Sequence, residues 1–164
     1  MRPSPTAVKG TLQRARAALD RHRGEAGHGR APRPGSDSER ALARRFADAY
    51  VAADIDGVIA LLTDDAWLSM PPAPHQYHGT AAIRSMLLAS FAHRGDRRLY
   101  LVPISANTQP ALAAYLSNRD PENRAAAPNG LFVLAMGGRQ IQAVTRFHVD
   151  GLYPRFGLAE SLRV

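Results

Sequence analysis

The second half of the sequence contains four strand-like segments in succession, with no helical pattern between them. They are RLYLVPIS, NTQPALAAYLS, GLFVLAM and RQIQAVTRFHV. Gly137-Gly138 is predicted to join the last two as a hairpin turn, and residues 118–129 to form a long polar hairpin loop. All helical patterns precede these strands. This order predicts an α+β fold, in which a cone of helices packs on a curved antiparallel sheet and leaves a pocket between them.

Three helices and one strand are predicted ahead of these segments. The first helix is capped by Asp37 or Ser38 and has an apolar face of four side chains, Leu42, Phe46, Ala49 and Tyr50. The second contains VIALL and ends at residues 63–65, and the third extends from Gly79 to about His93. Residues 66–70 are predicted to form a strand that stops at two prolines, and the loop PPAPHQYHG follows.

A run rich in glycine and proline separates this domain from an N-terminal segment. Residues 23–37 contain four Gly, two Pro and no large apolar side chain, which is typical of a flexible linker. Residues 5–19 are predicted to form a helix that Ser4 caps and Pro5 begins. We therefore divide the chain into a helix at 1–22, a linker at 23–37 and an α+β domain at 38–164.

The N-terminal segment carries most of the net charge. Of the formal charge of +7, residues 1–40 contribute +5. Lys9, Arg14 and Arg16 of the predicted helix are candidates for contacts with DNA phosphates, since basic segments attract nucleic acid. A solvated basic tail explains the same charge equally well.

Composition excludes several other classes of protein. The chain has no cysteine, which removes disulfides, thiolate metal sites and a cysteine nucleophile. No apolar run approaches the roughly 20 residues of a membrane span, and the N-terminus lacks the apolar part of a secretory signal. We expect a cytoplasmic protein that does not enter a membrane.

Candidate pocket residues lie on the predicted strands. Alternation places Asn107, Gln109 and Tyr115 on one face, where two amides and a phenol can bind a small polar or aromatic ligand, or can cap buried backbone groups. Trp67 and Met70 lie on another strand, as pocket lining or as plain core.

Three further side chains complete the candidate pocket. Tyr77 belongs to the loop that can cover the pocket mouth. Arg146 and His148 are two residues apart on the last strand and therefore share a face. There Arg146 either holds a ligand carboxylate or pairs with a carboxylate of this chain.

Metal and cofactor chemistry is weakly supported. His75 and His78 form a His-x-x-His pair outside any predicted helix and without a nearby carboxylate, so we expect no metal. The sequence contains no P-loop, no Gly-x-Gly-x-x-Gly and no Gly-x-Ser-x-Gly motif, and we expect no cofactor.

Catalysis by a carboxylate is also weakly supported. The acidic residues of the predicted domain fall at helix ends, turns and loops rather than inside pocket-facing strands. Asp54 is the best candidate for a general base, although helix capping explains it more simply. For an enzyme hypothesis, Asp54, Tyr115 and His148 are the residues to mutate.

Two parts of the sequence resemble known families. AVKGTLQRARAALD resembles the end of the region-four helix-turn-helix of extracytoplasmic-function sigma factors. Residues from about Glu39 to Leu162 resemble the C-terminal extension of one actinobacterial group of these factors, which belongs to the SnoaL-like polyketide cyclase, ketosteroid isomerase and nuclear transport factor 2 superfamily. The matching pieces are AYVAADIDGVIALLTDDAWLSMPPAP, YHGTAAI, LVPISANTQPALAAY and VTRFHVDGLYPRFGL.

The resemblance implies a function in transcription initiation. The first helix resembles a remnant of the recognition helix, while region two and most of region four do not occur in the sequence, so we do not expect this chain to direct RNA polymerase alone. We expect a truncated sigma-factor-like protein whose SnoaL-like domain regulates initiation or senses a small molecule. The alternative is a SnoaL-like isomerase, cyclase or hydrolase. Implied partners are RNA polymerase, sigma domains or promoter DNA through a longer parent chain, and a second copy of the chain through open sheet faces.

Overall fold

The computed structural model of the protein describes residues 29–120, 124–148 and 151–163. The chain divides into two compact units, residues 1–30 and 31–164, and the following description concerns the second. The helix predicted at residues 5–19, with Lys9, Arg14 and Arg16, lies outside the described residues.

Three helices begin the domain. Helix α2 (Asp37–Val51) is capped by Ser36, whose Oγ accepts a hydrogen bond from the Glu39 N–H at 3.3 Å, so the cap lies just before the predicted Asp37 or Ser38. Helix α3 (Ile55–Ala60) follows, and α4 (Thr80–Arg94) matches the predicted third helix. The prediction that the second helix ends at residues 63–65 is wrong, because α3 ends at Ala60 and β1 already begins at Leu62.

Seven strands form one sheet with the order β2-β1-β6-β5-β4-β3, and β7 pairs with the far end of β5. The strands are β1 (Leu62–Ser69), β2 (Gln76–His78), β3 (Leu99–Ala106), β4 (Gln109–Ser117), β5 (Ala125–Gly137), β6 (Gln140–Phe147) and β7 (Leu162–Arg163). A short 3-10 helix, η1 (Tyr153–Phe156), precedes β7. The N-terminal half of β5 falls within the predicted loop at 118–129, so that loop is shorter than expected.

The sheet is antiparallel, as predicted, except for one parallel pair of strands that makes it mixed. Strand β1 pairs in parallel with β6, with Leu68 beside Val144 and Ser69 beside Thr145. The other pairs are antiparallel. The sequence pattern could not reveal this pair, since alternation shows which face a residue occupies but not which distant strand lies next to it.

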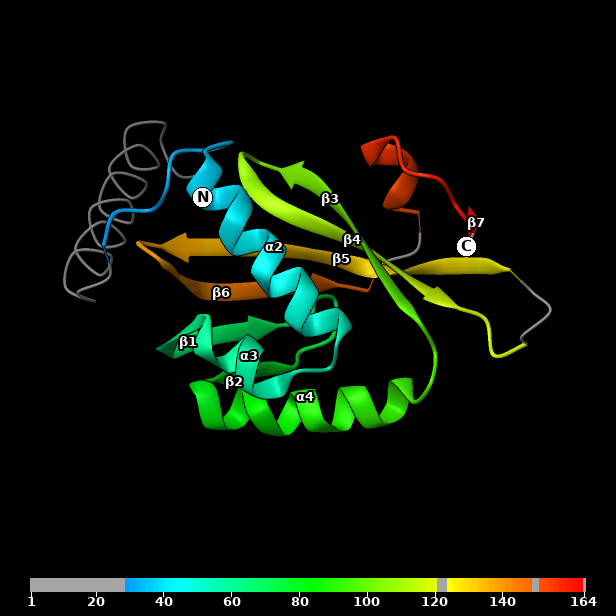
Figure 1. Cartoon of the computed structure of the whole chain (residues 1–164), viewed down its shortest axis with the longest axis horizontal. Coiled ribbons are helices and arrows are strands. Elements are labelled where there is room, and N and C mark those ends of the chain that lie inside the picture. Colours follow the sequence, from blue (N-terminus) through cyan, green and yellow to red (C-terminus); the bar gives the residue numbers. More distant parts are fainter. Residues whose placement is uncertain (1–28, 121–123, 149–150, 164) are drawn as a thin grey trace, which may run out of the picture. The chain divides into compact units, whose positions relative to one another are not determined.

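The two faces of the sheet bury different clusters. On the helical face, the main core includes Phe46, Leu87, Leu112, Phe132 and Leu134. Figure 1 shows α2 crossing this face and α4 running along the β1–β2 side. On the other face, a smaller cluster lies beneath the C-terminal segment that contains η1 and β7.

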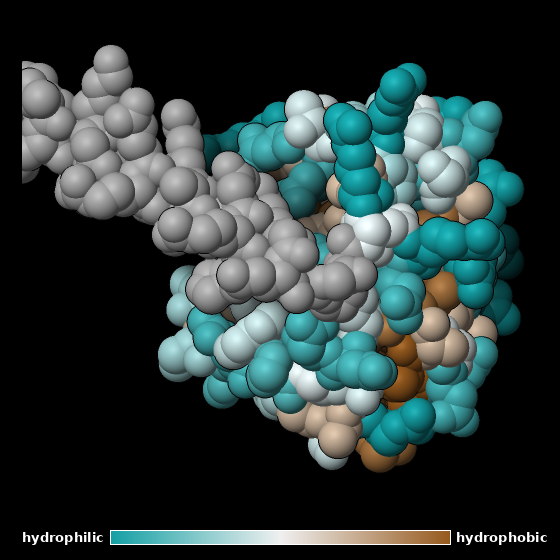
Figure 2. All heavy atoms as spheres, turned by 90° about the vertical axis from the view of Figure 1, so that its left-hand side faces the viewer, coloured by the Kyte–Doolittle hydropathy of each residue, from teal (hydrophilic) through white to brown (hydrophobic). Residues whose placement is uncertain are grey.

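The described surface is largely polar. Figure 2 shows mostly hydrophilic side chains on the face at the left of Figure 1, with one narrow hydrophobic strip between them. Within the described residues, no helix is both long enough and apolar enough to span a membrane.

Candidate functional site

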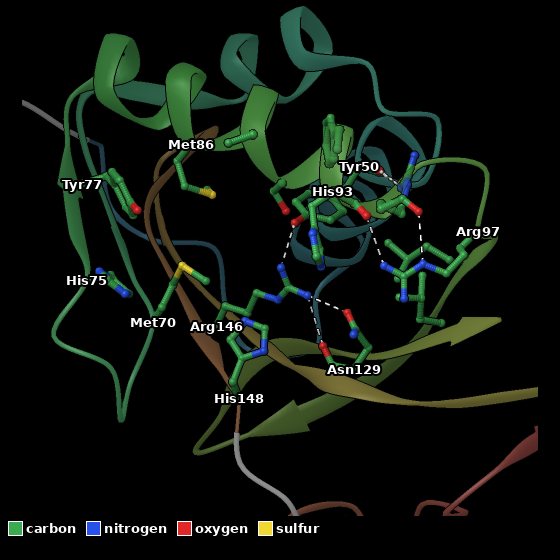
Figure 3. Close-up of a pocket in the computed structure, with 16 residues that line it drawn as sticks. Tyr50, Met70, His75, Tyr77, Met86, His93, Arg97, Asn129, Arg146 and His148 are labelled. Atoms are coloured by element: carbon green, nitrogen blue, oxygen red, sulfur yellow. Dashed lines mark hydrogen bonds between the residues drawn. The ribbon is translucent and has the colours of Figure 1, made fainter. Parts of the chain in front are cut away.

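A cavity of about 520 Å³ lies between the helices and the sheet. It is open to solvent on one side, and its walls come from α2, α4, the β1–β2 connection and strands β3 to β6 (Figure 3). Such a volume lies within the range of sites for small organic ligands. The cavity is therefore the candidate site.

Arg146 occupies the floor of the cavity. Its Nη2 donates to Asn129 Oδ1 at 2.6 Å and to the Asn129 carbonyl at 3.2 Å, and its Nη1 donates to Tyr50 Oη at 3.4 Å. The centre of the guanidinium group lies 5.0 Å from the centroid of the Phe132 ring, which supports it by a cation–π contact. The Nε of Arg146 is buried and has no hydrogen-bond partner among the described residues.

Local backbone geometry places these partners. Phe132 lies opposite Arg146 in the β5–β6 register, so both side chains face the helices. Gly130 has φ +96°, and a Cβ there would lie 2.5 Å from the Phe147 carbonyl oxygen. Only glycine fits this close approach, which carries Asn129 to the edge of the cavity.

The C-terminal end of α4 supplies a second basic group. Arg94 Nη1 donates to the Tyr50 carbonyl at 3.1 Å, and its guanidinium lies 5.1 Å from the Phe91 ring centroid. Arg97 donates to the carbonyls of Arg94 and His93, at 3.1 and 3.2 Å. These two arginines stabilise helix C-termini, where free carbonyl groups concentrate negative partial charge.

The opposite wall of the cavity is mostly apolar, with His75 among its side chains. Met70, Tyr77 and Met86 lie on one side of Arg146, and Arg97 lies on the other (Figure 3). Thioether and aromatic side chains adapt to the shape of an apolar ligand. The cavity therefore has a basic end and an apolar end.

His148 lies beside Arg146 at the solvent-exposed edge. Partial burial, and then the positive charge of Arg146, lower the pKa of His148 below its usual 6.5. The imidazole is therefore neutral at pH 7 and can accept or donate a hydrogen bond. None of the described residues that line the cavity is an Asp or a Glu.

Four of the predicted pocket residues line this cavity, and four do not. Met70, Tyr77, Arg146 and His148 line it. The others lie elsewhere: Trp67, Asn107, Gln109 and Tyr115.

The face of each strand explains these positions. Trp67 points away from the core that its neighbour Leu68 enters, and it stacks on His78 with ring centroids 4.4 Å apart. Tyr115 belongs to the cluster on the far face, where its hydroxyl donates to the Ala159 carbonyl at 2.7 Å. Asn107 and Gln109 are exposed at the β3–β4 turn.

The other candidates have structural positions. Asp54 caps α3, where its Oδ1 accepts from the Gly57 N–H at 2.8 Å, and it does not line the cavity. Of the His-x-x-His pair, His75 lines the cavity, whereas His78 stacks on Trp67. Among the described residues, no group of three or more His, Cys, Asp or Glu is arranged to hold a metal ion.

Several lining residues were not expected from the sequence: Tyr50, Met86, His93, Arg94, Arg97 and Asn129. Tyr50 was assigned to the helix core by its spacing, and this burial is correct, since it is 3% exposed. The basic residues at the end of α4 were a usable signal, because three of them occur within five positions. No sequence signal indicated Asn129, since its predicted position was in a loop.

Comparisons with known proteins now add to this geometry. The sequence profile of the SnoaL-like domain matches residues 43–153. The chain is 34% identical over 159 residues to the ECF RNA polymerase sigma factor SigG of Mycobacterium tuberculosis H37Rv. This match covers 97% of the chain but 42% of the relative, so the chain spans about two fifths of that protein's length.

Solved structures of similar fold include three bacterial proteins. A candidate ketosteroid isomerase from Kribbella flavida has a TM-score of 0.57 and 21% identity, covering 68% of this chain and 78% of its own. A candidate SnoaL-like polyketide cyclase from Shewanella putrefaciens has a TM-score of 0.53 and 17% identity, covering 68% and 90%. An NTF-2-like protein of unknown function from Burkholderia xenovorans has a TM-score of 0.52 and 16% identity, and the match covers 73% of this chain and 93% of that protein. At these identities the likeness concerns the fold alone.

Proposed function

The chain belongs to the SnoaL-like domain family, and we propose that it is a sigma-factor-related module that senses a small molecule and regulates transcription initiation. In this proposal the chain does not act as a complete sigma factor by itself. The observation that carries it is a ligand-sized cavity with basic and apolar walls and no acidic residue among its described lining, in a chain that aligns over 97% of its length with a sigma factor.

The chemistry of the cavity supports binding over catalysis. Isomerisation or cyclisation by proton transfer requires a positioned base, commonly a carboxylate, together with an acid that stabilises the oxyanion. The described lining offers arginines, histidines, an amide and phenols. These groups can hold a ligand firmly without removing a proton from carbon.

One observation favours an enzyme as the second candidate. His148 has a lowered pKa and lies in the cavity beside Arg146, which is a suitable place for a neutral base next to an oxyanion donor. The test is turnover of a Δ5-3-ketosteroid, followed by the absorbance of the conjugated enone. We expect no turnover above the uncatalysed rate. Turnover that disappears in His148→Gln would support the enzyme instead.

Partners follow from the same proposal. Within a longer parent chain, the domain would act on RNA polymerase, sigma domains or promoter DNA, with Lys9, Arg14 and Arg16 as the phosphate-contacting residues of the basic helix. The place of action would be the cytoplasm, where initiation occurs. Association of two copies through the outer sheet face is part of the proposal and is checked by light scattering.

The regulatory role is tested by reconstituted transcription. The chain is titrated into RNA polymerase that holds a complete sigma factor from the same cell, and initiation at that factor's promoter is measured. We expect no promoter-specific transcript from the chain with core polymerase alone, and a dose-dependent change in initiation when the complete factor is present. An unchanged rate at saturating chain, with no co-purification with polymerase or sigma factor, would contradict the proposal.

A further inference from the structure

The composition of the cavity points to a class of ligand. Resting on the proposed function, we propose that the cavity binds an amphiphilic carboxylate, with its carboxylate group at Arg146 and its apolar body against Met70, Tyr77 and Met86. The ligand is thus a monoanion with one charged end.

Charge is the first support for this ligand. The described lining contains three arginines, Arg94, Arg97 and Arg146, and no acidic residue. Partly buried positive charge without a counter-charge is costly, and a bound anion relieves this cost. A cationic ligand would add to it.

Free donors identify Arg146 as the residue that holds the anion. A guanidinium has five N–H groups, and three of those in Arg146 are directed at Asn129 and Tyr50. Of the two that remain, the Nε–H belongs to a buried atom without a partner among the described residues. The second N–H of Nη1, whose only hydrogen bond within the described part of the chain is the 3.4 Å one to Tyr50, is left for an acceptor that enters the cavity. Contacts with Asn129 and Phe132 fix the plane of the group before any ligand arrives, which favours a planar carboxylate.

The other two arginines of the lining, Arg94 and Arg97, have mainly structural roles. Arg94 and Arg97 donate to backbone carbonyls of α2 and α4, so their hydrogen bonds stabilise helix ends. Arg94 Nε, like Arg146 Nε, is buried without a partner among the described residues. Arg94 and Arg97 contribute positive potential to the cavity, while Arg146, which lies between the Met70–Tyr77 side and Arg97, is placed for the direct contact. We therefore expect one residue, rather than the whole basic group, to determine the preference for an anion.

The apolar wall determines the rest of the ligand. On this side Met70 and Met86 offer no hydrogen bonds, and of the side chains labelled there in Figure 3 only His75 and the Tyr77 hydroxyl can form them. A sugar phosphate or a polyanion would therefore leave most of its polar groups unpaired there. An alkyl or aryl body fills it instead. The cavity of about 520 Å³ admits a body of one or two rings or a medium-length chain.

The test compares three probes with the same phenyl ring and four-carbon chain but head groups of different charge: 4-phenylbutyrate, 4-phenylbutyramide and 4-phenylbutylamine. Binding to the full chain is measured by titration calorimetry at neutral pH. We expect the carboxylate to bind at least about tenfold tighter than the amide, and the amine to bind weakest. Added salt should reduce the difference between carboxylate and amide, because an electrostatic preference at a solvent-open site is screened.

Three variants locate the preference. Arg146→Met keeps an apolar stem of similar length and should bind the carboxylate and the amide equally. Arg139→Met changes an exposed arginine outside the cavity and should retain the full preference. Arg146→Lys keeps the charge without the guanidinium group and should fall between them. Circular dichroism establishes that each variant is folded, and the salt dependence of the unaltered chain tests the charge preference without any variant.

Each outcome bears on the proposal. Equal binding of the three probes, tighter binding of the amine, absence of binding at millimolar concentrations, or a preference retained in Arg146→Met would overturn it. The binding assay contains no polymerase, so its result is separate from that of the transcription assay. A carboxylate preference without any effect on initiation would defeat the regulatory function alone, and an effect on initiation without the preference would defeat this inference alone.

Discussion

At the scale of single residues, a chain of hydrogen bonds joins the cavity to the far face of the sheet. Arg146 donates to Asn129, and the Asn129 N–H donates to Tyr153 Oη at 3.1 Å. The one hydroxyl hydrogen of Tyr153 is shared between the carbonyls of Gly130, whose oxygen lies 2.9 Å from Oη, and Ala114. Tyr153 thus holds the strand segment that positions the Arg146 partner.

Tyr153→Phe should lower stability and weaken ligand binding together. The change leaves a backbone N–H and two buried carbonyls without their partner, which costs about 1 to 3 kcal/mol. Urea unfolding measures this loss, and titration with 4-phenylbutyrate measures the effect on Arg146. Tyr100→Phe is the matched control, because Tyr100 is only partly buried in the same cluster. Equal stability of the two variants would show that the Tyr153 hydroxyl has no such role.

His148 should make stability depend on pH. Its pKa is below 6.5 in the folded protein, so the unfolded chain binds a proton there more readily. This contribution to stability is fully present above pH 6.5 and is lost as the pH falls through the folded pKa. Charged or titratable groups that line a cavity with His148 are Arg146, Arg94, Arg97, His75, His93, Tyr50, Tyr77, Tyr153 and Glu160.

The measurement compares unfolding midpoints of the unaltered chain and His148→Gln at about pH 8 and about pH 5.5. We expect a smaller fall toward acid in the variant. Since the other histidines remain in both proteins, the difference between them reports His148. Identical falls would contradict the assignment.

The site residues could be predicted from the sequence only in part. Arg146 and His148 were placed on one face by their spacing, and both line the cavity. Tyr115 was predicted to face the pocket, but it lies on the other face of the sheet. Alternation separates the two faces of a strand without telling which one the helices cover. Asn129 enters the site through the backbone at Gly130, and a positive φ leaves no mark on hydrophobic patterning.

At the scale of elements, helix boundaries followed capping and glycine signals, and strand pairing did not. Helix α4 was predicted within a residue or two at both ends, since Gly79 and Gly95 flank it. Strand β2 was predicted as a loop because its three residues are too short for an alternating pattern. Its pairing with β1 is a consequence of tertiary packing.

Variants of Asp54, at the start of α3, distinguish a helix-capping role from a catalytic role. Asp54→Ala should lower the free energy of unfolding by about 0.5 to 2 kcal/mol, and Asp54→Asn should lower it much less, because an Asn side chain caps equally well. Neither variant should change binding of 4-phenylbutyrate, since Asp54 lies outside the cavity. A ketosteroid turnover abolished by Asp54→Asn would contradict this assignment.

At the scale of the whole molecule, one sheet has two buried faces of unequal size. The helices cover one face, and the segment from Leu152 to Leu162 covers part of the other. There Tyr115 and Tyr153 pack edge to face, with ring centroids 5.1 Å apart. The C-terminal segment therefore belongs to the fold of the domain.

Removal of residues 151–164 should expose this second cluster. Leu131 and Tyr115 would become accessible, and the Tyr115 hydroxyl would lose the Ala159 carbonyl. We expect a lower thermal midpoint and increased binding of the dye ANS relative to the full chain. A deletion of residues 159–164 alone, which retains η1, should show a smaller effect. An unchanged midpoint in the longer deletion would show that the segment is dispensable.

The parallel pairing of β1 with β6 has a consequence for synthesis on the ribosome. Ser69 and Thr145 are neighbours across these strands but lie 76 positions apart in the chain. While the polypeptide is being made, β1 therefore emerges long before the strand that covers its inner edge. Helix α4 and the β3–β4 hairpin can form early, but the sheet closes only after residue 147 has left the exit tunnel. A nascent chain stalled before that point would present an open strand edge and would need protection from aggregation.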